Sequence, residues 1–430
     1  KTSVILGLLL AILIGVVISS LHSFSMPIHL KKRGRDKLAL LHAIENHGCN
    51  EPSNRCRPVC RRNHHLRHSS SSLDDRARSI YDRSYCINIT VGSFARTYSV
   101  ILDTGSMATW LTAPECTFDP KSPDQPRIRS TQNACTIDPD FNRTRQVFPY
   151  KESLSFHTKM EPYNASYATG NVSGFIGTDD MALGKFQLPG QDLLVVNKMS
   201  SNFGRVVADG FAGLAYPRQQ PEEPKSLLES LLHEFTFFSL YLRRSMLPET
   251  DDGGALTWGA LDNEHCDFAD VIYVNLTNVH DSTANPGHLW EVIVEDFTFD
   301  GTRIRSRAHD PEPKLAGVDS GSSVIILPLE QRDEYVTLNN AEYTHGVYAV
   351  ECDAVVTSIN FVINNHTFVV PSSSLIVKHE KVTPRCALAV DAFPFFDSKV
   401  EILLGQPFLR SFCTVWNFTQ GAIGFASIKQ

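Results

Sequence analysis

The sequence contains the same short acidic motif twice, as Asp103-Thr104-Gly105-Ser106 and as Asp319-Ser320-Gly321-Ser322. Each copy adjoins an apolar run, residues 100–102 before the first and residues 324–327 after the second. An acidic side chain in such buried-strand sequence costs free energy unless it is hydrogen-bonded. Two copies arise by chance in about one in a thousand chains of this length at average residue usage. The motif therefore marks an internal repeat, and its spacing of 216 residues (319 minus 103) predicts two similar lobes.

A second landmark follows each copy of the motif. An apolar-apolar-glycine segment occurs as Phe211-Ala212-Gly213 in the first half and as Leu403-Leu404-Gly405 in the second. Each half thus reads as a strand, a loop that carries the aspartate, and a later buried strand that ends at glycine. A single Asp-Thr-Gly is most often only a hairpin turn. Two copies with matching landmarks instead favour two carboxylates that are brought together as an acid–base pair.

From about Tyr85 to its C-terminus, the chain resembles the pepsin-like aspartic proteases. Trp110 stands seven residues after the first aspartate, where that family has its tryptophan, and Tyr167-Ala168-Thr169-Gly170 with residues 174–177 resembles the flap, the hairpin that covers the family's active site. Residues 288–292, 299–301, 408–412 and 423–426 resemble further strands and turns of the second half. The resemblance implies an all-β, bilobal pepsin-like acid protease fold, in which two similar β-barrel-like lobes hold the active-site cleft between them.

The resemblance assigns the catalytic role of an aspartic endopeptidase to Asp103 and Asp319. Two carboxylates a few ångströms apart do not both ionise, so the pair shares one proton and titrates as a unit. The ionised member takes a proton from a bound water while the protonated member hydrogen-bonds the scissile carbonyl, and no cofactor or metal is implied. Supporting roles fall, by resemblance, to the other motif positions: Thr104 and Ser320 brace the two loops, Ser106 and Ser322 donate to the outer carboxylate oxygens, and Gly105 and Gly321 complete the loops.

The flap and the cleft floor supply a second set of expected site residues, namely Tyr167, Thr169, Gly170, Trp110, Ile101 and Phe211. By resemblance, Tyr167 closes over the substrate with its hydroxyl held by the Trp110 indole, and so excludes bulk water. An apolar floor that includes Ile101 and Phe211 predicts large hydrophobic residues on both sides of the cut bond.

The sequence departs from the family pattern at two positions near the dyad. Gln406 stands where many members have an aspartate, and the loss of a nearby anion is expected to ease ionisation of the dyad. Gly317 replaces a bulkier apolar residue, so a larger pocket is expected on the primed side of the substrate site.

Other functions are less well supported by the sequence. No H-E-x-x-H and no phosphate-binding G-x-x-x-x-G-K-[ST] occurs. The spacing of Cys56, Cys60, His64 and His65 does not match a zinc site, and a disulfide or tether is a better explanation for the two cysteines. One alternative is a catalytically silent pepsin-like glycoprotein that binds peptides, and another is a purely structural glycoprotein. We expect a monomer whose partners are a peptide or protein substrate and its own pro-segment, with no nucleic acid.

The N-terminus indicates the secretory pathway. Residues 1–23, with an uninterrupted apolar run over residues 4–18 behind Lys1, are typical of a signal peptide, although an uncleaved signal-anchor is an alternative. No later segment is apolar enough to span a membrane, so no membrane attachment is expected after signal removal. Residues 84–265 and 266–430 are expected to form the N-terminal and C-terminal catalytic lobes, and the protein is expected to be secreted or delivered to lysosomes or endosomes.

Charge distribution predicts a zymogen. Residues 24–83 read as a pro-segment and carry 13 Lys and Arg against 6 Asp and Glu, a net charge of +7, whereas residues 84–430 carry 26 against 41, a net charge of −15. A basic segment on an acidic body is held near neutral pH and released as carboxylates protonate. Cleavage of the connection is expected between Ser69 and Arg83.

Cysteines and glycosylation sequons agree with an oxidising compartment. Ten cysteines are present, and by resemblance Cys116 pairs with Cys135 and Cys352 with Cys386. The sequence leaves the pairing of the other six open: Cys49, Cys56, Cys60, Cys86, Cys266 and Cys413. Seven N-x-[ST] sequons occur, of which Asn142, Asn164, Asn171, Asn275 and Asn365 are glycosylation candidates, while Asn88 and Asn417 fall in expected strands.

A capping box at Ser226 and Glu229 predicts a helix with its leucines in the core.

Overall fold

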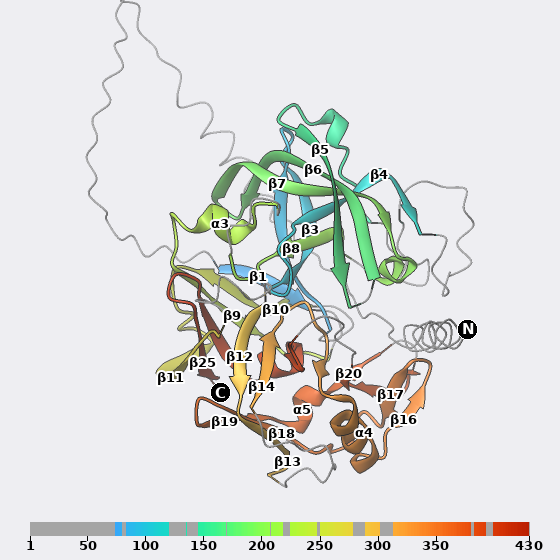
Figure 1. Ribbon diagram of the computed structural model, residues 1–430, viewed down its shortest axis with the longest axis vertical. Coiled ribbons are helices and arrows are strands. Elements are labelled where there is room, and N and C mark those ends of the chain that lie inside the picture. Colours follow the sequence, from blue (N-terminus) through green and yellow to red (C-terminus); the bar gives the residue numbers. More distant parts are fainter. Residues whose placement is uncertain are drawn as a thin grey trace, which may run out of the picture.

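The computed structural model describes residues 74–79, 83–119, 135, 145–168, 170–206, 208–217, 224–246, 250–277, 289–301, 313–379, 382–392 and 399–429. The expected signal peptide, most of the expected pro-segment, Thr169, Asn142, Cys49, Cys56 and Cys60 lie outside these residues. Strands dominate the described part of the chain, as expected, and they form two lobes (Figure 1).

The largest sheet has thirteen strands in the order β11-β25-β24-β9-β10-β1-β2-β3-β8-β4-β7-β6-β5. Its first-half strands are β1 (Asp74–Ser79), β2 (Tyr85–Val91), β3 (Arg96–Asp103), β4 (Trp110–Phe118), β5 (His157–Tyr167), β6 (Gly170–Leu183), β7 (Phe186–Met199), β8 (Gly210–Gly213), β9 (Phe237–Leu242) and β10 (Thr250–Trp258). Strands β11 (Cys266–Asn275), β24 (Cys413–Asn417) and β25 (Ala422–Ile428) come from the second half. One sheet therefore runs through both lobes.

Three smaller sheets build the rest of the second half. The first contains β12 (Trp290–Val294), β14 (Lys314–Val318), β23 (Ile402–Leu404), β15 (Ile325–Ile326) and β22 (Val390–Asp391). The second contains β13 (Asp296–Phe299), β18 (Ile359–Ile363) and β19 (His366–Val370). The third contains β16 (Glu342–Thr344), β17 (Val347–Val350), β21 (Cys386–Leu388) and β20 (Ile376–Lys378). The short helices are α3 (Leu227–Leu231), α4 (Leu329–Leu338), α5 (Ser372–Leu375) and α6 (Gln406–Leu409), with the 3₁₀ turns η2 (Tyr150–Glu152) and η3 (Ser201–Arg205).

The internal repeat is visible in the strand pairing. In the first half, β3 runs parallel to β8, with Asp103 opposite Gly213. In the second half, β14 runs parallel to β23, with Val318 opposite Leu404. Each motif loop thus follows a strand, and a later strand carries the apolar-apolar-glycine landmark, as the sequence predicted; the structure adds that these two strands pair.

Aromatic packing joins the two halves of the chain. The Phe238 and Trp416 rings stack with centroids 5.6 Å apart, and Trp290 meets Trp416 edge-on at 5.0 Å. The Trp290 indole also donates a hydrogen bond of 3.0 Å to the Leu214 carbonyl of the first half. Because these large rings are fully buried, they contribute strongly to a single core that spans both lobes.

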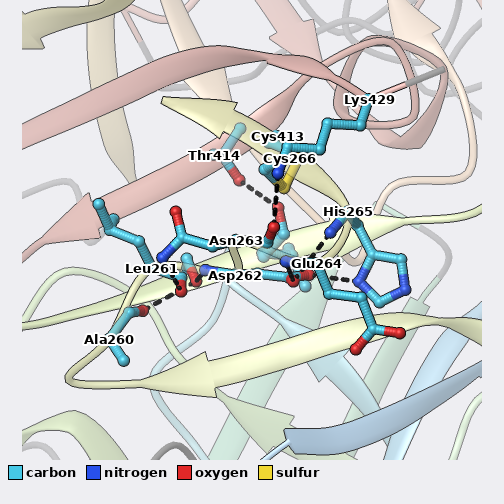
Figure 2. A network of polar contacts seen from close by, with 12 residues as sticks. Ala260, Leu261, Asp262, Asn263, Glu264, His265, Cys266, Cys413, Thr414 and Lys429 are labelled. Atoms are coloured by element: carbon cyan, nitrogen blue, oxygen red, sulfur yellow. Dashed lines mark hydrogen bonds and ion pairs between the residues drawn. A yellow bond between two sulfur atoms is a disulfide. The ribbon is translucent and has the colours of Figure 1, made fainter. Parts of the chain in front are cut away.

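The connection from β10 to β11 is tied down by polar contacts (Figure 2). The Asp262 carboxylate accepts hydrogen bonds from the backbone N–H groups of Glu264 and His265 and lies 2.7 Å from His265 Nδ1. Lys429 donates its backbone N–H to the His265 carbonyl and its ammonium group to the Asn263 carbonyl. A disulfide between Cys266 and Cys413 follows directly. The start of the second half is therefore fastened to its last two strands.

The predicted helix is confirmed as α3. The Ser226 hydroxyl accepts a hydrogen bond from the Glu229 backbone N–H, and the Glu229 carboxylate accepts one from the Ser226 N–H. Leu227, Leu228 and Leu231 are buried. In the described part of the chain, no helix is long and apolar enough to cross a membrane. No group of three or more potential metal ligands occurs among the same residues.

Candidate active site

The two motif loops meet, and their aspartates touch. Asp103 ends β3, Asp319 follows β14, and the two carboxyl groups are hydrogen-bonded to each other. Both loops need glycine for this approach: a Cβ atom on Gly105 would lie 2.6 Å from Asp319 Oδ1, and one on Gly321 would collide with the Asp103 carboxylate. The repeated motif therefore places one carboxyl group from each half in a single site.

Thr104 and Ser320 brace the loops in the expected way. The Thr104 N–H donates to Ser320 Oγ at 3.1 Å, and the Ser320 N–H donates to Thr104 Oγ1 at 2.9 Å. Each hydroxyl then donates across the interface, Thr104 to the Val318 carbonyl and Ser320 to the Leu102 carbonyl. Both residues are fully buried, so all four bonds are shielded from water.

Burial controls the ionisation of the pair. It raises the pKa of Asp103, against hydrogen bonds from the Ser106 hydroxyl, at 2.5 Å, and the Gly105 N–H, at 2.9 Å, which favour the charged form. Burial holds the pKa of Asp319 well above its usual range, and the charge of Asp103 raises it further. Both carboxyl groups are therefore harder to ionise than an exposed aspartate, and the pair shares one proton, with the Ser106 hydroxyl favouring the charge on Asp103.

Ser322 does not play the expected part. Its hydroxyl donates to the Val324 carbonyl at 2.9 Å, and only its backbone N–H serves Asp319. The two halves differ because the Ser106 hydroxyl donates to Asp103, whereas the Ser322 hydroxyl donates to the Val324 carbonyl two residues along its own chain segment.

Neighbouring residues show how the fold accommodates Gln406 and Gly317, the two departures from the family pattern. The Gln406 side chain is fully buried and donates from Nε2 to the Ser320 carbonyl at 2.9 Å, so a neutral amide supports the Asp319 loop. The expected enlargement at Gly317 is not seen. A Cβ atom there would lie 3.0 Å from the terminal methyl groups of Leu289 and Leu403, because these two side chains fill the space.

The flap is the hairpin of β5 and β6, in which Tyr167 pairs with Gly170. The Trp110 indole donates to the Tyr167 hydroxyl at 2.9 Å, as expected. Burial and the nearby charge of Asp103 raise the pKa of the Tyr167 hydroxyl, so it stays protonated. The Phe211 ring stacks on Trp110 with ring centroids 4.9 Å apart, and its centroid lies 5.2 Å from that of the Tyr167 ring. Ile101 lies beside Phe211 in the parallel pair of β3 and β8. The described floor and flap residues therefore form one apolar cluster.

Two residues of this region gave no signal in the sequence. Phe203 packs edge-on against both Trp110 and Tyr167. The buried Arg145 guanidinium donates to the carbonyls of Phe203 and Val206, at 2.6 and 2.7 Å, and burial lowers its pKa to about 10. Arg145 follows a polar, charged stretch with no recognisable pattern, so only the fold reveals that it supports the wall beside the flap tyrosine.

Three disulfides lie among the described residues. Cys116–Cys135 and Cys352–Cys386 form as the resemblance implied, and Cys266–Cys413 settles one pairing that the sequence left open. Cys86 is buried in β2 opposite Ile101. Among the described sequons, Asn164, Asn171, Asn275 and Asn365 are exposed, whereas Asn88 and Asn417 are half-buried in strands.

Comparisons with known proteins agree with this geometry. The sequence model of the eukaryotic aspartyl protease family matches residues 84–428. Human gastricsin is 25% identical over 356 residues, which cover 80% of this chain and 82% of gastricsin. Aspartic protease 17 of Caenorhabditis elegans is 27% identical over 354 residues, which cover 80% of this chain and 83% of that protein.

A solved structure supports the fold. The crystal structure of an aspartic proteinase from Irpex lacteus aligns with a TM-score of 0.63 and 18% identity, over 84% of this chain and 98% of that one. The family match, which spans well over half of the chain, decides the assignment. This chain belongs to the eukaryotic aspartyl protease family.

Proposed function

We propose that the protein is an aspartic endopeptidase that hydrolyses peptide bonds with a water molecule activated by Asp103 and Asp319. The observation that carries the proposal is the buried pair of carboxyl groups, which two mutually braced loops bring together and of which only Asp103 accepts a hydrogen bond from its loop's second hydroxyl. The Asp103 carboxylate takes a proton from the water as it attacks the scissile carbonyl carbon, and Asp319 donates its proton to the carbonyl oxygen. Collapse of the tetrahedral intermediate breaks the C–N bond as the nitrogen receives a proton from the dyad.

The flap completes this site in the proposal. Tyr167, held by the Trp110 indole, covers the dyad and limits the entry of water. Ile101 and Phe211 receive hydrophobic side chains of a peptide or protein substrate, and neither a cofactor nor a metal takes part.

A catalytically silent peptide-binding protein is the competing function. Loss of an aspartate, of a following glycine or of the flap tyrosine would favour it, and all of these residues are present. Cleavage of denatured haemoglobin at acid pH, blocked by a statine-type transition-state mimic, tests the two proposals against each other. Tight binding of the mimic without any cleavage would favour the silent protein.

We further propose that the enzyme enters the secretory pathway through residues 1–23 and is made as a zymogen. The basic segment and the acidic lobes attract each other near neutral pH. Carboxylates paired with the segment have depressed pKa values, so the attraction is present above those pKa values and is lost as the pH falls through them. Acidified pro-form should therefore lose mass, while the Asp319→Asn variant stays intact if maturation is autocatalytic. An equal mass loss at neutral pH would contradict the electrostatic clamp.

A further inference from the structure

The flap carries two of the glycosylation sequons, one on each of its strands. The first runs from Asn164 to Ser166 near the end of β5, and the second runs from Asn171 to Ser173 at the start of β6. In the register of the hairpin, Asn164 lies opposite Ser173, and Ser166 lies opposite Asn171. Each asparagine is therefore paired with the hydroxyl residue of the other sequon.

These four residues share one face of the hairpin, which we name the outer flap face. Residues directly opposite in an antiparallel pair project to the same side, and successive residues along a strand alternate between the two sides. The other side of the hairpin carries Tyr167 and Val172, which belong to the same apolar cluster as Trp110 and Phe211. Because that side packs toward the cleft floor, the outer flap face points away from it.

The two asparagine side chains are accessible for modification. Asn164 and Asn171 are exposed, and within the described part of the chain neither side-chain amide makes a hydrogen bond. The Asn171 backbone is held in place, because its N–H donates to Ser200 Oγ and its carbonyl accepts from the Ser200 N–H, both at 2.9 Å. The Asn417 amide, by comparison, is joined to Gln420 by two hydrogen bonds. The flap sequons therefore combine a fixed backbone with a side chain that points into solvent.

We propose that Asn164 and Asn171 are N-glycosylated, and that glycans on the outer flap face exclude folded proteins from the cleft while extended peptides still bind. In the transfer, the asparagine amide nitrogen attacks C1 of the first sugar of a lipid-linked oligosaccharide. The bond from C1 to the lipid diphosphate breaks, the diphosphate leaves with the electron pair, and the nitrogen loses one proton. This inference rests on the proposed secretory route and on the proposed endopeptidase activity.

The position of the glycans explains why they would select substrates by size. Diagonal neighbours on one face of a hairpin lie roughly 7–8 Å apart, so glycans on Asn164 and Asn171 would crowd one small area. An extended peptide lies between the cleft floor and the side of the flap that carries Tyr167, where it meets neither glycan. The hairpin reaches from the first lobe toward the second (Figure 1), and the bulk of a folded protein needs the space outside it. The favoured substrates are therefore unfolded chains and short peptides.

Mass spectrometry of glycopeptides tests the modification itself. The full-length protein is secreted from a eukaryotic host, and both Asn164 and Asn171 should carry a glycan in most molecules. Asn365, in the exposed turn between β18 and β19, provides an internal reference. An unmodified flap in a protein that carries a glycan at Asn365 would overturn the proposal and leave the secretory route intact. A complete lack of glycans would contradict both.

Two double variants test the selection by size. Ser166→Ala with Ser173→Ala removes both sequons but keeps the asparagines, whereas Ser166→Thr with Ser173→Thr keeps both sequons. The substrates are one cleavable peptide, free in solution and inserted into a surface loop of a folded carrier protein. We expect the alanine pair to cut the loop at least about fivefold faster than the unsubstituted enzyme, with kcat/KM for the free peptide unchanged within about twofold. The threonine pair and Asn365→Gln should change neither rate.

The contradicting result is an unchanged rate on the loop substrate after both flap glycans are lost. If the alanine pair is not secreted, removal of the glycans from the folded enzyme by a glycosidase provides the same comparison. No cleavage of the free peptide by any of these proteins would contradict the endopeptidase activity instead. The glycopeptide measurement does not depend on catalysis, so it decides whether the flap is modified in that case too.

Discussion

Thr104 and Ser320 lie 216 residues apart in the chain, and each donates its backbone N–H to the other's side-chain hydroxyl. This reciprocal pair holds Asp103 and Asp319 in register, because each hydroxyl belongs to the residue that follows one of these aspartates. The local pseudo-twofold arrangement is the structural consequence of the internal repeat.

We expect Ser320→Ala to destabilise the protein by about 1–3 kcal/mol, because it leaves the buried Thr104 N–H and Leu102 carbonyl without these partners. Ser320→Thr keeps the hydroxyl and should retain most of that stability. Urea denaturation of the three proteins measures the difference. Equal midpoints for Ser320→Ala and the unsubstituted chain would show that the brace contributes nothing.

The sequence predicted the elements that depend on local pattern. The repeated motif predicted the meeting of Asp103 and Asp319, and the capping box at Ser226 predicted α3. It did not predict contacts that depend on distant chain segments. Cys266 and Cys413 pair because β11 and β24 both flank β25. Arg145 donates to the Phe203 carbonyl from a position 58 residues earlier in the chain.

Two expectations failed for equally physical reasons. The Ser322 hydroxyl donates to a carbonyl within its own loop, so the symmetry of the motif does not extend to its last residue. The Gly317 site is filled by Leu289 and Leu403, because packing from neighbouring segments replaces the volume that a larger side chain would occupy.

The hydrogen bond from Ser106 to Asp103 predicts a shift in the pH profile. Ser106→Ala removes a donor that favours the charged carboxylate, so the pKa of Asp103 should rise and the acid limb of kcat/KM should move to higher pH. Ser322→Ala is the matched control, because its hydroxyl bonds Val324 and its loss should leave the acid limb in place. The measurement is the profile of kcat/KM against pH for the unsubstituted protein, Ser106→Ala and Ser322→Ala. Identical acid limbs for all three would exclude this role for Ser106.

The indole donor of Trp110 predicts coupling to the flap. Trp110→Phe keeps an aromatic ring beside Phe211 but removes the hydrogen bond to Tyr167, and we expect kcat/KM to fall about fivefold, the equivalent of roughly 1 kcal/mol. Tyr167→Phe should have a similar effect, and the double variant should be little worse than either single one. Fully additive losses in this cycle would mean that the two side chains act independently.

The apolar floor predicts substrate preference. Large hydrophobic residues should be favoured on both sides of the cut, and Ile101→Phe should shift the preference toward smaller side chains by filling the floor beside Phe211. Profiling with a peptide library measures both effects. A preference for acidic or basic residues on the N-terminal side of the cut would contradict this description of the floor.

The most direct test of the account is peptidase activity in the Asp103→Asn and Asp319→Asn variants. An amide neither shares the proton nor activates water, so both variants should lose activity to below a few per cent while the fold remains. Stability provides the control for folding. Because the folded pKa of Asp319 is raised, its ionised form lowers stability as pH rises through that pKa, and Asp319→Asn should melt at a higher temperature than the unsubstituted protein at neutral pH but not at strongly acid pH. Two folded, inactive variants are the predicted result, and a folded variant that still cleaves denatured haemoglobin at more than a few per cent of the original rate would contradict the assignment of the dyad.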